Sequence, residues 1–270
     1  MNCASLLPTY FISHGGGPWP YMQGESRRKY SQLESSLADI PKQIDKTPDA
    51  ILMISAHWES QEFAIMSSPK PRMLYDYGGF PEHTYKVQYP APGSPLLAQQ
   101  IQTLLKTAEI SSHIDEHRGY DHGAFSPLAI IYPDANVPVI QLSLQADLDP
   151  FIHIKLGQAL TPLRKQGVLI IGSGLSYHNL QNFGSAAKDS SASFDHWLQA
   201  SLCPLHGKPR VDRLINWEQA PAARLSHPRE EHLLSLMVAV GAGYNEPGKC
   251  IYHEENFMGG ISVSSFRFGR

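Results

Sequence analysis

The chain has 270 residues, 42% of them hydrophobic and 17% charged, so it can bury a sizeable core. A net charge of −3 without basic runs argues against nucleic acid or a membrane surface as partner and favours a small molecule. We expect a cytoplasmic protein for three reasons. The three cysteines have no Cys-x-x-Cys spacing, the sequence has no signal-peptide pattern, and no apolar run reaches the ~20 residues that span a bilayer.

Apolar runs predict strands in the first third of the chain. Residues 6–13 and 50–55 have the composition of buried strands, and 62–66 is a shorter candidate. Between the first two, apolar residues with helical spacing predict a helix over 27–40, which ends at Pro41.

The segment 67–95 is rich in proline, glycine and tyrosine. Two interpretations remain open for such a long connection: a functional loop or lid, or an ordered loop whose aromatic rings anchor it to the core. Ser94 and Pro95 then begin a helix, because proline suits the first helical position. The expected inward stripe of this helix is Leu96, Leu97, Ile101, Leu104 and Leu105.

The second half of the chain continues the alternation of strands and helices. The predicted elements are a strand over 137–144, a helix over 150–164, a strand over 168–171, a mostly helical region over 185–223, a helix that begins at Ser226-His227-Pro228 and a final strand over 260–268. This alternation predicts an α/β fold, with a mostly parallel or mixed central sheet covered by helices on both faces. Without repeats or linkers, we expect one catalytic domain over 1–270.

Histidines follow three of the apolar runs. His14 and His57 come directly after the first two, and His178 comes a few residues after the run at 168–171. A single histidine in such a place is more often a hydrogen-bonded structural group than a ligand. Ligands of open α/β sheets, however, bind beyond the carboxyl ends of the strands, and neutral imidazole is the commonest metal ligand. The repeated placement therefore predicts a metal site and an active site at this edge.

Other histidines are ambiguous from spacing alone. His122 lies in Gly-Tyr-Asp-His-Gly, where it is either a turn residue or a site residue that Asp121 orients. His232 lies one turn into the predicted last helix, and His227 competes with it for a role. None of the candidate ligands belongs to a His-x-x-x-His pair of the helical zinc-site type, so spacing does not choose between them.

Six segments together resemble the DODA-type branch of the class III extradiol ring-cleavage dioxygenases, in the LigB-like superfamily. They are FISHGGGP, ISAHWES, YDYGGFPEHTYKVQYPAPGSP, GYDHGAFSPL, IGSGLSYHNL and HPREEHLLSL, in the family's order and over nearly the whole chain. The resemblance implies metal ligands at His14, His57 and His232, and not at His227. It further implies that His178 is the active-site base, which in some members contacts the metal, and that His122 lies near substrate and dioxygen.

The resemblance also bears on the metal. Wider class III enzymes hold non-haem Fe(II) with two histidines and one glutamate, whereas this branch has His232 in place of the carboxylate. Glu230 and Glu231 lie beside it in sequence, and we expect them to point away. An all-histidine site also suits zinc, which binds more tightly than Fe(II). Zinc has no redox chemistry, so ring cleavage requires Fe(II), although Zn(II) is expected as an alternative bound metal.

The implied reaction is cleavage of a catechol ring, such as that of DOPA or a related catechol, with dioxygen to give a muconic semialdehyde. Tyr75, Phe80 and Tyr120 are candidates for shaping the pocket. Two alternatives use the same residues differently: a zinc-dependent hydrolase that activates water, and a non-enzymatic binding protein on the same fold.

Overall fold

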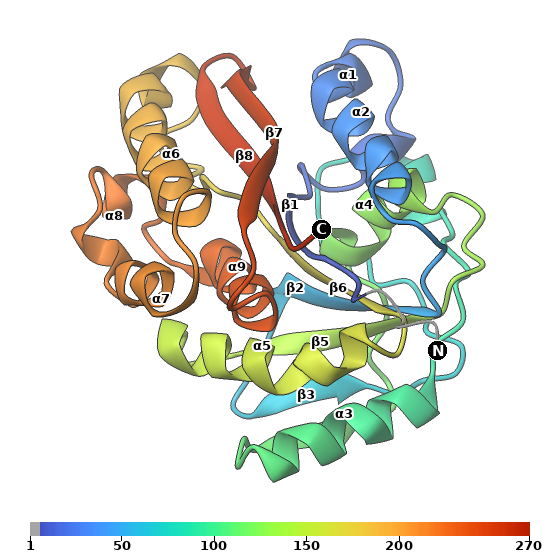
Figure 1. The fold of residues 1–270 in the computed structure, drawn as a ribbon. Helices are drawn as coiled ribbons and strands as arrows, with labels where there is room; N and C mark the ends of the chain where they lie inside the picture. Colours follow the sequence, from blue (N-terminus) through green and yellow to red (C-terminus); the bar gives the residue numbers. More distant parts are fainter. Residues whose placement is uncertain (1–5) are drawn as a thin grey trace.

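The computed structural model describes residues 6–270, which form an eight-stranded mixed sheet covered by helices on both faces (Figure 1). Its strand order is β4-β3-β5-β2-β6-β1-β8-β7. The four central strands are parallel neighbours: β5 (Val139–Gln145), β2 (Ala50–Ser60), β6 (Val168–Gly174) and β1 (Thr9–Ser13). The predicted α/β class is confirmed. Their shared direction brings the carboxyl ends of β1, β2 and β6 to one edge.

Antiparallel pairs extend the sheet on both sides. β8 (Ile261–Phe268) pairs with β1, and β7 (Gly248–Phe257) pairs with β8. At the other edge, β3 (Phe63–Met66) pairs antiparallel with β5 and parallel with β4 (Ser112–Asp115). The sequence does not predict β4 and β7, because both are largely polar and partly exposed edge strands without an apolar run.

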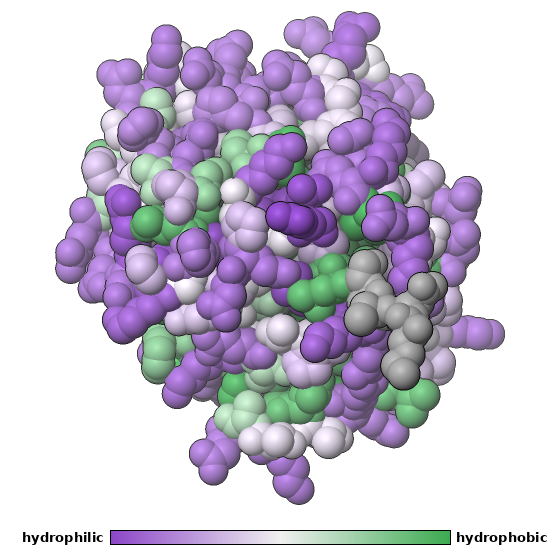
Figure 2. All heavy atoms as spheres, viewed as in Figure 1, coloured by the Kyte–Doolittle hydropathy of each residue, from purple (hydrophilic) through white to green (hydrophobic). Residues whose placement is uncertain are grey.

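Apolar clusters cover both faces of the sheet. One cluster joins it to α3 (Pro95–Thr107), α5 (Pro150–Arg164) and α9 (Glu231–Ala242). The other joins it to α2 (Ser31–Asp39) and α4 (His122–Ile131). Successive strand residues serve opposite clusters, since side chains alternate across a sheet. The face shown in Figure 2 is mostly hydrophilic, with apolar side chains in small patches.

The remaining helices are shorter or lie at the periphery. They are α1 (Gly24–Arg28), α6 (Lys188–Leu202), α7 (Gly207–Ile215), α8 (Ala223–Ser226) and the 3-10 helices η1 (Trp19–Tyr21), η2 (Ile40–Gln43), η3 (Glu82–Tyr85), η4 (Gly184–Ala187) and η5 (Trp217–Gln219). Within the described residues, no helix is both long and apolar enough to cross a membrane.

Three helix predictions need correction. The helix expected over 27–40 is divided into α1 and α2 around Tyr30, whose ring stacks on Trp19 at 4.8 Å. Leu96 is 77% exposed and does not belong to the inward stripe of α3. The last helix begins at Glu231 rather than near Pro228, and this shift changes which side chains face the site.

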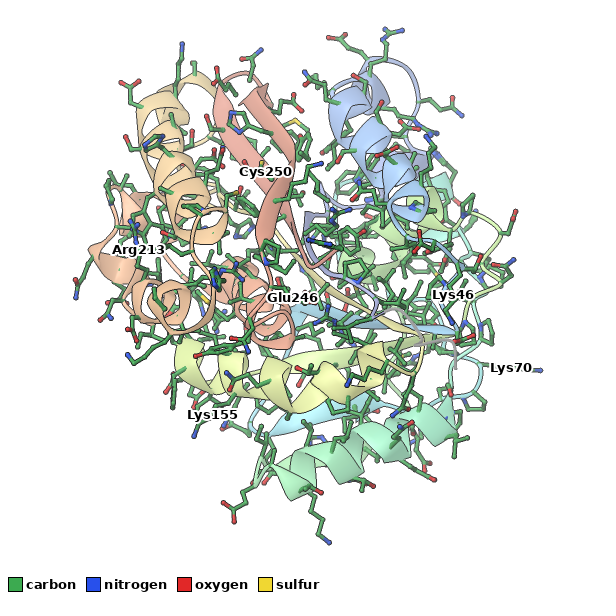
Figure 3. The ribbon with its side chains drawn as sticks, in the orientation of Figure 1. Lys46, Lys70, Lys155, Arg213, Glu246 and Cys250 are labelled. Atoms are coloured by element: carbon green, nitrogen blue, oxygen red, sulfur yellow. The ribbon has the colours of Figure 1, made fainter. Side chains whose placement is uncertain are left out.

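An ion pair between Arg164 and Glu246 lies at the amino-terminal end of the central strands, opposite the carboxyl ends. Arg164, at the end of α5, donates from Nε to the Leu7 carbonyl and from Nη1 to the Ala242 carbonyl, each at 2.6 Å. Its second terminal nitrogen pairs with Glu246, which lies between α9 and β7 (Figure 3). The guanidinium therefore joins the start of β1 to the end of α9.

Candidate metal centre and active site

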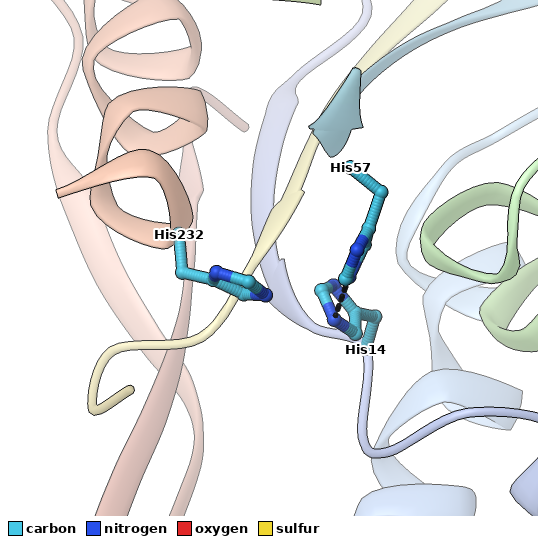
Figure 4. A group of neighbouring side chains, drawn as sticks. All are labelled: His14, His57 and His232. Atoms are coloured by element: carbon cyan, nitrogen blue, oxygen red, sulfur yellow. Dashed lines mark hydrogen bonds between the residues drawn. The ribbon is translucent and has the colours of Figure 1, made fainter. Parts of the chain in front are cut away.

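Three histidines converge beyond the carboxyl ends of the central strands (Figure 4). His14 follows β1, His57 lies near the end of β2, and His232 is the second residue of α9. One nitrogen of each ring lies within 4.8 Å of the others, and Nε2 of His14 is 3.2 Å from Nε2 of His57. Nitrogens that share one tetrahedral zinc ion at about 2.1 Å lie about 3.4 Å apart. The group thus has the spacing of a metal site.

The Nδ1 atom of each of these rings has its own partner. The pairs are His14 with Ser173 Oγ at 3.2 Å, His57 with Asp76 Oδ2 at 3.5 Å and His232 with Glu231 Oε1 at 2.9 Å. Metal-binding histidines usually donate their second N–H to such groups, which fixes the ring and its tautomer. With Nδ1 engaged, each ring offers Nε2 to a metal.

The three rings are uncharged at neutral pH. Burial, with neighbouring imidazoles, lowers the pKa of His14 and His232 well below the ordinary value. The same causes lower the pKa of His57 to about 4. Neutral imidazole is the form that binds metals, so the donor set fits Fe(II) or Zn(II) chemically.

His178 lies beside this group, in the loop after β6. Its ring stacks on His232 with centroids 3.4 Å apart and planes at 20°. Its Nδ1 is 3.1 Å from Oε1 of Glu231, the same oxygen that accepts from His232. Glu231 therefore holds both rings.

The position of Glu231 differs from the expectation that it would point away. Because α9 begins at Glu231, its side chain turns to the site, while Glu230 pairs with Arg224. Burial would raise the pKa of Glu231, but hydrogen bonds from His178 and His232 outweigh it and lower the pKa. The carboxylate is therefore ionised.

His122 completes the cluster from the opposite side. It is the first residue of α4 rather than a turn residue, and its ring centroid is 3.9 Å from that of His57. Its Nδ1 is 2.9 Å from Oδ1 of Asp76, which also accepts from its backbone N–H at 2.9 Å. Asp76 thus contacts both His57 and His122.

The neighbouring Asp121 does not orient His122. Its carboxylate accepts hydrogen bonds from Ser55, Gln141 and Arg118, and it caps α4. The orienting residue is Asp76, which sequence reasoning missed, because only its place within the aromatic segment 67–95 pointed to it. That segment is ordered, partly through the hydroxyl of Tyr77 on the Thr84 carbonyl. The segment therefore has both of the features considered for it. Its aromatic side chains hold it in place as an ordered loop, and it also supplies the site carboxylate of Asp76.

His227 lies away from the cluster. It is fully buried, its Nε2 donates to the Ser176 carbonyl at 3.0 Å, and its ring packs on Phe194 and Trp217. The structure thus brings His232, and not His227, to the other site histidines.

The five site histidines line one cavity of about 260 Å³. The glycines 15–17 form part of its wall, and Gly15 has a φ of +81°, where an added Cβ would lie 2.5 Å from Trp19. The three residues expected to shape the pocket do not line it; they are Tyr75, Phe80 and Tyr120. The Tyr120 ring is buried, and its hydroxyl donates to the Val139 carbonyl. The aromatic lining consists instead of Tyr30, Tyr177, Phe183 and Phe257.

Comparison with known proteins identifies the family of the chain. A family model described as the catalytic LigB subunit of aromatic ring-opening dioxygenase matches residues 8–269. A protein of Beta vulgaris named 4,5-DOPA dioxygenase extradiol is 41% identical, with 98% of this chain and 97% of that protein covered. An Escherichia coli K12 protein of the same name is 32% identical, with 98% and 96% covered.

A solved structure of an uncharacterized protein from Escherichia coli K12 superimposes with a TM-score of 0.79 at 29% identity, covering 97% of this chain and all of that one. The solved structure shares the fold of this chain, and the sequence comparisons identify its family. The chain belongs to the LigB family of aromatic ring-opening dioxygenases and is an oxidoreductase of the dioxygenase class.

Proposed function

We propose that this protein is a metal-dependent extradiol dioxygenase that cleaves a catechol with dioxygen to a muconic semialdehyde. The observation that carries the proposal is the convergence of His14, His57 and His232 in one cavity, whose lining beyond the histidines is mostly apolar. The names of the relatives support the reaction class.

His14, His57 and His232 would hold the metal through Nε2. Fe(II) bound there would supply the electron transfer between catechol and dioxygen that ring cleavage requires, whereas Zn(II) would bind without supporting it. Ser173, Asp76 and Glu231 keep the three rings oriented through Nδ1. These contacts fix the orientation of the ligand rings before a metal binds.

His178 is the proposed general base. Glu231 engages its Nδ1, so Nε2 is left to take a proton from a catechol hydroxyl in the cavity. An imidazole suits this task near neutral pH. The alternative role of His178 is that of a metal ligand. Because its ring stacks on His232, it lies close to the proposed metal ligands.

His122 is proposed to act on the dioxygen side of the substrate. Asp76 engages its Nδ1, which leaves Nε2 to hydrogen-bond an oxygen atom of substrate or dioxygen. The two proposed catalytic histidines thus approach the cavity from opposite sides of the ligand group.

The test is dioxygen uptake on a panel of simple catechols, with metal-stripped protein reloaded anaerobically with Fe(II) or with Zn(II). We expect uptake and a yellow ring-opened product with Fe(II) alone. Full iron occupancy without uptake on any catechol would contradict the proposal. A hydrolase would consume no dioxygen, so the same measurement separates the two reactions.

A further inference from the structure

We propose that the substrate is a catechol with a short, uncharged apolar substituent, rather than one with an ionised amino-acid side chain. This inference rests on the proposed ring cleavage and specifies its substrate. It concerns the part of the cavity beyond the histidines, where the substituent of a bound catechol must lie.

The wall of this outer part is built from two segments far apart in sequence. One is the loop after β6, and the other is the end of β7 with its turn into β8. Their side chains that line the cavity are Leu175, Leu180, Phe183, Phe257, Met258 and Ile261. Among the described residues that line the cavity, none is Asp, Glu, Lys or Arg.

A charged substituent would find no partner on this wall. Of the two lining tyrosines, Tyr177 already donates its hydroxyl to the Asn182 carbonyl, and burial raises the pKa of Tyr30 to about 12, so Tyr30 stays uncharged and neither side chain offers a charge to pair with an ionised substituent. The histidines are engaged with the ionised Asp76 and Glu231, which repel a substrate carboxylate. Burying an ionised group without a partner is costly.

The mouth of the cavity offers apolar surface to a ligand. Leu180 is 72% exposed and Phe183 is 41% exposed, and both line the cavity. Few large hydrophobic side chains are exposed in the described part of the chain. Leu180 and Phe183 therefore form a small exposed apolar patch beside the cavity. An apolar substituent would remove this surface from water, which is favourable.

The cavity size limits the substituent. The cavity volume is about 260 Å³. This is slightly smaller than the pockets of about 300–1,000 Å³ that hold drug-sized ligands. One aromatic ring with a short chain matches this space.

The first experiment compares catechols that differ only at the end of one side chain. 4-Propylcatechol, dopamine and 3-(3,4-dihydroxyphenyl)propionate end in a methyl, an ammonium and a carboxylate group, and catechol and DOPA complete the panel. We expect kcat/KM of the iron-loaded enzyme to be at least tenfold higher for 4-propylcatechol than for dopamine, the propionate and DOPA. Dissociation constants of the zinc-loaded protein should rank in the same order.

A charge placed at the mouth tests the location. Leu180→Arg should reduce the preference for 4-propylcatechol over the propionate at least fivefold. The matched control is Leu96→Arg, because Leu96 is also an exposed leucine, at 77%, but lies on α3 away from the cavity. The control should keep the wild-type preference.

The outcomes separate this inference from the proposed function. Equal or better turnover and binding of DOPA or the propionate would overturn the apolar substrate class and leave ring cleavage standing. Absence of turnover on every catechol, at full iron occupancy, would overturn ring cleavage. In that case the binding order in the zinc-loaded protein still decides whether the pocket prefers the apolar ligand.

Discussion

Oε1 of Glu231 lies 3.1 Å from Nδ1 of His178, and the same oxygen lies 2.9 Å from Nδ1 of His232. One carboxylate therefore links the proposed base to a proposed metal ligand. Asp76 repeats the arrangement on the other side, where it contacts His57 and His122. Because each carboxylate contacts two rings, we expect the orientation of ligands and of catalytic groups to change together.

Glu231→Gln should lower metal affinity or turnover by about 10- to 100-fold, the usual effect of losing a group that orients a metal ligand. Chelator competition measures the affinity, and dioxygen uptake at saturating iron measures turnover. Glu230→Gln is the control, since Glu230 pairs with Arg224 instead of a site histidine. Equal behaviour of the two variants would contradict an orienting role for Glu231.

His178→Ala should keep the metal and lose turnover by at least about 100-fold, the usual contribution of a general base. His178 lies outside the group formed by His14, His57 and His232, and Glu231 holds its Nδ1, which leaves Nε2 for proton transfer. Metal content by mass spectrometry, measured beside dioxygen uptake, distinguishes the roles. Loss of metal in this variant would make His178 a ligand.

His232→Ala and His227→Ala should have opposite effects on metal content. His232 lies within the group of converging nitrogens, whereas His227 is packed against Phe194 and Trp217. We therefore expect folded His232→Ala to lose the metal and folded His227→Ala to keep it with reduced stability. The reverse result would assign the third ligand to His227.

His227 should make the protein less stable in acid. Burial lowers its pKa to about 4, below the value of about 6.5 in an unfolded chain. The unfolded state then binds a proton first, so this stability is complete above pH 6.5 and is lost as the pH falls toward 4. By this linkage, moving from pH 7 to pH 5 should cost about 2 kcal/mol of the free energy of unfolding.

The measurement is urea unfolding of metal-free protein at both pH values, for wild type and His227→Gln. Glutamine can keep the hydrogen bond to the Ser176 carbonyl but does not titrate. The contributions of other histidines, including the buried His153, are common to both proteins and cancel in the comparison. An equal loss of stability in the two proteins would show that His227 does not titrate in this way.

The sequence alone determined the central sheet and the placement of two histidines. The apolar runs before His14 and His57 are local signals, because a strand buried on both faces needs continuous hydrophobic residues. Parallel strands then bring the residues at their carboxyl ends to one edge of the sheet. The family resemblance added the choice of His232, and the structure places it among the others.

The tertiary structure decided the contacts that surround these histidines. Asp76 reaches His122 across 46 positions of sequence, and the wall residues Phe257 and Met258 come from a polar edge strand and its turn, which no apolar period marks. The direction of Glu231 depends on the residue at which α9 begins. Sequence periodicity reports which face of an element is buried, but orientation and long-range contacts depend on how complete elements pack together.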